Sequence, residues 1–145
     1  VQLIVGHVGD MFDHLTCQDV VSFTGSAQTA MKLQSHPIIA RESVRFIAER
    51  DSLNASILGP DATPGTPEFD LFVREVCMEM TVKAGQKCTA IRRALAPTEF
   101  VDAVEEAIRD RLTRTKVGDP RAEDTRMGAL VNRGQREDVK ARIAE

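Results

Sequence analysis

Val20-Val-Ser-Phe-Thr-Gly-Ser26 joins an apolar run to a helical pattern, and the expected fold follows from this junction. Residues 19–23 predict a β-strand, because valine and phenylalanine are common in strands. The strand ends at Thr24-Gly25-Ser26, and Ser26 predicts the start of a helix that continues to about Gln34. A strand that leads directly into a helix is typical of the α/β class with a largely parallel sheet.

The same alternation of strand and helix signals continues along the chain. Short apolar runs predict further strands at residues 1–5, 44–48, 53–58, 89–95 and 127–131. Other patterns predict helices at residues 10–15, 68–84, 98–112 and 134–144. His36-Pro37 is expected to end the helix that begins at Ser26, and Pro97 to lie in the first turn of the helix at 98–112. In the helix at 68–84, apolar residues recur with a helical period and are expected to face inward: 69, 72, 73, 76, 77 and 80.

Composition narrows the function classes. The net charge is −3 and aromatic residues make up 4% of the 145 residues, without a basic patch, which argues against a nucleic-acid-binding protein. The three cysteines are an odd number without metal-type spacing, and they indicate reduced thiols in a cytoplasm and no metal site. Neither a membrane-spanning run nor a signal peptide is expected. The chain opens on an apolar run without a methionine, so we expect a piece of a longer polypeptide.

Lys83-Ala-Gly-Gln-Lys-Cys-Thr-Ala90 presents Cys88 on a short turn that contains glycine. Gly85 can adopt backbone conformations that other residues avoid, and can therefore turn the chain before the thiol. The positive charges of Lys83 and Lys87 favour the thiolate form of a nearby cysteine. The alternative is that Cys88 is a small buried apolar residue, as we expect for Cys77.

Three further places could carry chemistry. Gly25 and Ser26 lie where a strand meets a helix, so backbone N–H groups and the serine hydroxyl could bind an anion, or Ser26 could simply cap the helix. Glu49 follows a strand-like run, at the edge where α/β proteins build their sites, or it is a solvated loop acid paired with an arginine. Arg92 and Arg93 could reach an acidic substrate.

Taken together and in order, these motifs resemble the aldehyde dehydrogenase superfamily. The similarity rests on Val20-Val-Ser-Phe-Thr-Gly-Ser26, then Glu49, then Gly85-Gln-Lys-Cys88-Thr. It continues through Lys116-Val-Gly-Asp-Pro120 and Met127-Gly-Ala-Leu-Val131, and so covers the whole chain but only about the middle third of a family member. Most family members follow the glutamate with Leu-Gly-Gly, whereas this chain has Arg50-Asp-Ser52.

A narrower resemblance is to the branch that acts on CoA-thioester semialdehydes. It rests on Glu49-Arg-Asp-Ser-Leu-Asn54 and on Met80-Thr-Val-Lys-Ala-Gly-Gln-Lys-Cys-Thr-Ala-Ile-Arg-Arg93. The branch holds semialdehyde dehydrogenases of aerobic aromatic-acid breakdown, including the dehydrogenase domain of a bifunctional phenylacetate-degradation protein. The resemblance therefore implies a place in phenylacetate or benzoate degradation.

The resemblance also implies roles for individual residues. Cys88 would be the nucleophile and Glu49 the general base, while Thr24, Gly25 and Ser26 would contact the phosphates of NADP or NAD. Residues 1–48 would end a Rossmann-type cofactor domain, and residues 49–145 would form part of the α/β catalytic domain. The substrate would be a small aldehyde, with a CoA thioester as one candidate, and the full-length protein a homo-oligomer. Two alternatives stay open: an inactive folded or oligomerising module, and a CoA-acylating aldehyde dehydrogenase.

Overall fold

The structure is a computed structural model that describes residues 1–144, and the chain divides into two compact units. The first unit is Val1–Asp51, and the second begins at Ser52. Each unit has a hydrophobic cluster of its own. No helix among the described residues is long and apolar enough to cross a membrane.

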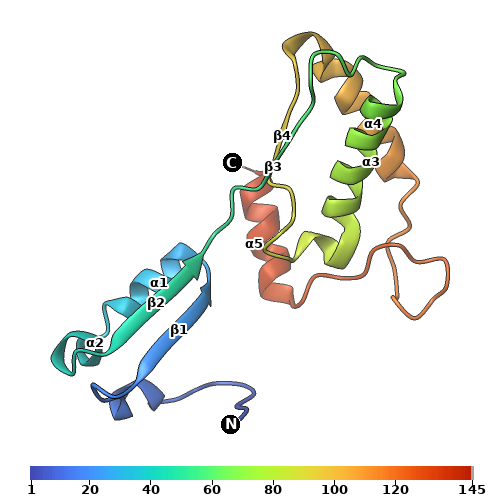
Figure 1. Cartoon of the computed structure of the whole chain (residues 1–145). Coiled ribbons are helices and arrows are strands. Elements are labelled where there is room, and N and C mark those ends of the chain that lie inside the picture. Colours follow the sequence, from blue (N-terminus) through green and yellow to red (C-terminus); the bar gives the residue numbers. More distant parts are fainter. Residues whose placement is uncertain (145) are drawn as a thin grey trace. The chain divides into compact units, whose positions relative to one another are not determined.

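The first unit is a parallel pair of strands with helices between them in the chain (Figure 1). Its elements are the 3-10 helix η1 (Met11–His14), β1 (Val20–Gly25), α1 (Ala27–Gln34), α2 (Pro37–Arg41) and β2 (Arg45–Arg50). The pairing register runs from Val20 opposite Arg45 to Gly25 opposite Arg50. The expected α/β class and the passage from strand to helix near Ser26 are confirmed.

The cluster of the first unit joins α2 to the strands. Ile38, Ile39 and Val44 are buried, and half-buried apolar residues pack around them: Phe12, Leu15, Val21 and Phe46. Pro37 does not simply end the preceding helix, as the sequence predicts, but begins α2. Proline is favoured in a first helical turn because its missing N–H would have no partner there.

The second unit packs helices beside a second parallel pair of strands. Its elements are β3 (Ala55–Ile57), α3 (Pro67–Thr81), η2 (Val82–Gly85), β4 (Arg93–Leu95), η3 (Thr98–Phe100), α4 (Val101–Thr113) and α5 (Arg133–Ile143). Ala55 pairs with Arg93 and Ile57 with Leu95. The described residues therefore form two separate two-stranded parallel sheets and not one larger sheet.

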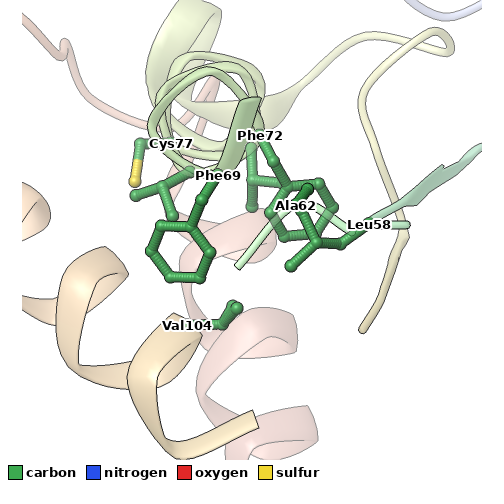
Figure 2. Close-up of a cluster of buried hydrophobic side chains, with 8 residues drawn as sticks. Leu58, Ala62, Phe69, Phe72, Cys77 and Val104 are labelled. Carbon is green, nitrogen blue, oxygen red and sulfur yellow. The ribbon is translucent and has the colours of Figure 1, made fainter. Parts of the chain in front are cut away.

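The core of the second unit forms where α3 meets α4 (Figure 2). Thr66 caps α3 by accepting from the Phe69 N–H, and Pro67 occupies the first turn. The predicted inward face of α3 is confirmed at five positions: Phe69, Phe72, Val73, Val76 and Cys77. Met80 is the exception, with 45% of its surface exposed, because it lies in the last turn beyond Cys77.

Two predicted strands, at residues 1–5 and 127–131, are wrong. A strand needs a neighbour to take its backbone hydrogen bonds. Residues 1–5 have no such neighbour within the described chain, and Met127 forms only an isolated parallel bridge with Val117. Apolar side chains alone were therefore a misleading signal in both places.

Candidate active site

Cys88 lies exposed on a tight turn between η2 and β4. The Ala90 N–H donates to the Lys87 carbonyl oxygen over 3.2 Å, which closes a four-residue turn around Cys88 and Thr89. The alternative that Cys88 is a buried apolar residue is wrong. The turn instead presents the thiol to its surroundings.

The backbone that leads to this turn is left-handed at three successive residues. Lys83, Ala84 and Gly85 have φ angles of 52°, 53° and 70°. The sequence predicts this conformation only for Gly85, since a left-handed residue that carries a Cβ costs about 1–2 kcal/mol. The segment reverses the chain after α3. The Gln86 side chain secures the segment by donating to the Lys83 carbonyl oxygen over 2.9 Å and accepting from the Val131 N–H over 2.8 Å.

Asn54 holds the Cys88 turn from the start of β3. Its side-chain Nδ2 donates to the Cys88 carbonyl oxygen over 2.7 Å and to the Ala90 carbonyl oxygen over 3.0 Å. Its own carbonyl oxygen accepts from the N–H groups of Arg92 and Arg93. The sequence gives no signal for this role, because the partners lie 34 and 36 positions away.

Arg92 binds the same turn at a different carbonyl group. Its Nη2 donates to the Lys87 carbonyl oxygen over 2.9 Å, and longer contacts of Nε and Nη1 reach the Ser52 hydroxyl and the Gly85 carbonyl oxygen. The guanidinium is therefore engaged with the turn and not directed at an acidic substrate. The Arg93 side chain makes no hydrogen bond or ion pair with the rest of residues 1–144.

Lys87 forms an ion pair with Glu79 of α3. The Nζ–Oε1 distance is 2.8 Å, and the two side chains are only 23% and 16% exposed. Since its charge is already paired with a carboxylate, Lys87 does not supply the unpaired positive charge that the sequence predicts beside the thiol. The second carboxylate oxygen of Glu79 is buried without a hydrogen-bond partner in the described chain.

The other two cysteines differ from Cys88 in environment. Burial raises the pKa of the Cys77 thiol, an effect that the charge of Arg111 opposes, and the Cys77 sulfur lies 3.9 Å from the Ile108 carbonyl oxygen. The structural role expected for Cys77 fits this position in the core. Cys17 is exposed in the first unit.

Glu49 lies in the first unit, near the carboxyl end of β2. Its register partner is Thr24 of β1, so both residues lie at the carboxyl edge of the parallel pair. The sequence places Glu49 just after the strand, but β2 continues to Arg50. Of the alternative, a solvated loop acid paired with an arginine, the loop position and the arginine partner are wrong, because Glu49 is a strand residue without an ion pair to the described residues, whereas its side chain is exposed to solvent as that alternative expects.

The β1–α1 junction carries part of a donor set for a phosphate. Ser26 caps α1, since its hydroxyl accepts from the Thr29 N–H over 3.2 Å. The Gln28 N–H in the first turn has no intrahelical partner and could meet an anion. The Ala27 N–H, however, donates to the Asp51 carboxylate over 3.2 Å, so a phosphate bound there would displace a charge of the same sign.

Asp51 itself has a φ of 54°, a left-handed conformation that glycine adopts without strain. The Leu-Gly-Gly of the resembled family would place a glycine at this position, which explains how the two sequences can share one backbone path. No group of three or more His, Cys, Asp or Glu side chains within residues 1–144 is placed to hold a metal ion.

Comparison with known proteins gives a consistent picture. Residues 1–145 match the sequence profile of the aldehyde dehydrogenase family. The chain is 53% identical over 135 residues to 3,4-dehydroadipyl-CoA semialdehyde dehydrogenase from Aromatoleum evansii, which covers 93% of this chain and 26% of that protein. It is 32% identical to human 4-trimethylaminobutyraldehyde dehydrogenase, over 82% of this chain and 23% of that protein. The chain thus spans about a quarter of the length of these relatives.

Solved structures agree with the sequence matches. A point mutant of betaine aldehyde dehydrogenase from Staphylococcus aureus, in its apo form, superimposes with a TM-score of 0.82 at 27% identity, over 97% of this chain and 27% of that one. The enzyme without that substitution, in complex with NAD+, gives a TM-score of 0.76 at 28% identity, over 87% of this chain and 24% of that one.

Proposed function

The chain belongs to the aldehyde dehydrogenase family, and we propose that the protein containing it oxidises an aldehyde through a thioester on Cys88. The observation that carries this proposal is the exposed thiol on a turn that Asn54 and Arg92 hold through different carbonyl groups. A nucleophile must be both accessible and fixed in position, and Cys88 meets both needs.

In the first half-reaction the Cys88 thiolate attacks the aldehyde carbon. A C–S bond forms, and the π electrons of the carbonyl move to its oxygen, which becomes an oxyanion. The Cys88 N–H is a donor for this oxyanion, because its hydrogen has no partner within the described chain. A nicotinamide cofactor, when bound, would supply the acceptor for the hydride of the same carbon, and Cys88 would then hold an acyl thioester.

In the second half-reaction Glu49 takes a proton from water, and the resulting hydroxide attacks the thioester carbon. The C–S bond then breaks, which releases the acid and restores the thiolate. A carboxylate free of ion pairs, as Glu49 is within the described residues, remains available as a base. Gly25, Thr24 and Ser26 would lie against the cofactor phosphates, provided that Asp51 gives up the Ala27 N–H.

The relatives support a proposal for the cofactor and the substrate class. We propose NAD or NADP as the hydride acceptor, since a structural relative is described with NAD+. We propose a CoA-thioester semialdehyde from aromatic-acid breakdown as the substrate. Its support is the 53% identity to a CoA-semialdehyde dehydrogenase, well above the identity to the betaine aldehyde enzyme.

The test uses the full-length protein with a semialdehyde substrate and either cofactor. Cys88→Ala should abolish both the first turnover and steady-state turnover, whereas the matched control Cys77→Ala should keep both. Glu49→Gln should still release up to one equivalent of reduced cofactor per site, and then turn over about 10²–10⁴ times more slowly. Unchanged turnover in Cys88→Ala would refute the proposal. A rate that depends on added free CoA would instead identify a CoA-acylating enzyme, and a wild-type protein without activity would identify an inactive module.

A further inference from the structure

The peptide bond between Lys87 and Cys88 is held at one end and free at the other. Its carbonyl oxygen, on Lys87, accepts from Arg92 Nη2 over 2.9 Å and from the Ala90 N–H over 3.2 Å. Its hydrogen, on the Cys88 nitrogen, meets no acceptor within residues 1–144. In a trans peptide the C=O and N–H bonds point in opposite directions. The two bonds to the Lys87 oxygen therefore aim the Cys88 N–H away from Arg92.

The Arg92 guanidinium, which donates to the Lys87 carbonyl oxygen, carries a full positive charge. Hydrogen bonds to a charged donor are about twice as strong as neutral ones, and hydrogen bonds along one chain of groups polarise each other. A cation at the carbonyl oxygen draws electron density through the peptide, which makes the N–H at its other end a stronger donor. The effect acts on the group that would meet an oxyanion formed at the Cys88 sulfur.

We propose that Arg92 is a positioning residue that orients and polarises the Lys87–Cys88 peptide so that its N–H stabilises the oxyanion of the reaction. The inference rests on the proposed function, because it assumes that an oxyanion forms at Cys88. Arg92 acts through the peptide and does not itself touch the substrate.

Neighbouring residues do not share this role. Asn54 binds the Cys88 carbonyl oxygen, which belongs to the next peptide, so it fixes the turn without polarising the Cys88 N–H. Arg93 has the same charge one position further along, but its side chain has no partner in the described structure. Arg93 is therefore a matched control for the removal of charge close to the turn.

Two reactions of the same thiol separate this role from that of merely holding the turn. Alkylation by iodoacetamide displaces iodide from a saturated carbon, so no oxyanion forms beside Cys88. Attack on an aldehyde, or on an activated ester such as p-nitrophenyl acetate, does form one. A residue that only keeps the thiol in place affects both reactions, whereas one that polarises the oxyanion donor affects only the second.

The experiment compares Arg92→Met, Arg92→Lys and Arg93→Met in the full-length protein. Arg92→Met should slow the first turnover of the aldehyde and the release of p-nitrophenolate about 10- to 100-fold. This loss is smaller than the 10²–10³-fold that follows removal of an oxyanion donor itself, because the Cys88 N–H remains. The rate constant for alkylation of Cys88 should stay within about twofold, and KM should change little. Arg92→Lys should lose less than Arg92→Met, since a cation remains, and Arg93→Met should match the wild type.

Equal losses in alkylation and in acyl transfer would overturn the proposal, because Arg92 would then only hold the turn. Unchanged first-turnover rates in both Arg92 variants would also overturn it. If Arg92→Met loses its native circular dichroism, Arg92→Lys is used in its place. Its rate of acyl transfer must then fall more than its rate of alkylation. Failure of the proposed function is a separate result: Cys88→Ala would then remain active, whatever the Arg92 variants do.

Discussion

The ion pair between Glu79 and Lys87 should stabilise the second unit more than any exposed pair in the chain. Lys87→Met removes the ammonium and leaves a carboxylate that is 16% exposed and already has one buried oxygen without a partner. Removing one partner of a fully buried pair costs about 3–5 kcal/mol, and an exposed pair contributes about 0–1 kcal/mol. The exposed fractions of the Glu79 and Lys87 side chains lie between those of a fully buried pair and an exposed pair. We therefore expect Lys87→Met to lower the free energy of unfolding by about 1.5–3 kcal/mol.

A double-mutant cycle isolates the interaction from the effects of each substitution. The cycle consists of the wild type, Lys87→Met, Glu79→Gln and the double variant, each unfolded in urea and followed by circular dichroism. We expect a coupling energy of about 1–2 kcal/mol, a value between the exposed and buried ranges. The control cycle uses Arg74 and Glu75, an ion pair on the same helix with side chains 56% and 39% exposed.

The control pair should give a coupling energy below about 1 kcal/mol, as exposed pairs do. A coupling energy for Glu79 and Lys87 no larger than that of the control would refute the reasoning, because burial would then add nothing. A double variant as unstable as Lys87→Met alone would also contradict it, since the cost is assigned to the unpaired Glu79 carboxylate.

Three more measurements test the described packing and backbone. Ala84→Gly should raise the free energy of unfolding by up to ~1 kcal/mol, because glycine adopts the φ of 53° without strain, and a loss of stability in urea would contradict this. Phe72→Ala should lower it by about 3–5 kcal/mol, whereas exposed Leu71→Ala should change it by less than about 1 kcal/mol. Burial raises the pKa of the Cys77 thiol in the folded state, so stability is full below the unfolded pKa of about 8.5 and falls as pH rises beyond it. Urea titrations at pH 7 and pH 10 should show a smaller fall in Cys77→Ala.

The parts of the fold that the sequence predicts are those with short-range causes. Ser26 caps α1 because its hydroxyl reaches a backbone N–H three residues ahead. The inward face of α3 follows from a helical period that continues as far as Cys77. The left-handed backbone at Gly85, before the Cys88 turn, follows from the conformational freedom of glycine, which is a property of that residue alone.

The parts that the sequence does not predict depend on partners far away in the chain. Lys83 and Ala84 favour right-handed helix, yet both are left-handed, so contacts outside the segment must impose that conformation. Asn54 has no local signature of a role, because its two acceptors come from residues more than thirty positions later. The pairing of Lys87 with Glu79 depends on how the chain turns after α3.

The contacts around the Cys88 turn offset the backbone strain of the left-handed residues before it. Two left-handed residues that carry a Cβ cost about 2–4 kcal/mol in total. A hydrogen bond from a charged group contributes about 1.5–3 kcal/mol, and a neutral one about 0.5–1.5 kcal/mol. The contacts of Arg92, Asn54 and Lys87 can therefore each offset a large part of the strain, but none offsets all of it with a margin.

This balance explains why three separate side chains converge on one short turn. With all three in place, the strained backbone is the stable one and the Cys88 N–H keeps a single direction. With one removed, the other two still offset most of the strain at Lys83 and Ala84, so the turn keeps its shape with a smaller margin. The geometry at the thiol is thus a property of contacts made by α3, β3 and the residues before β4, and not of the motif around Cys88 alone.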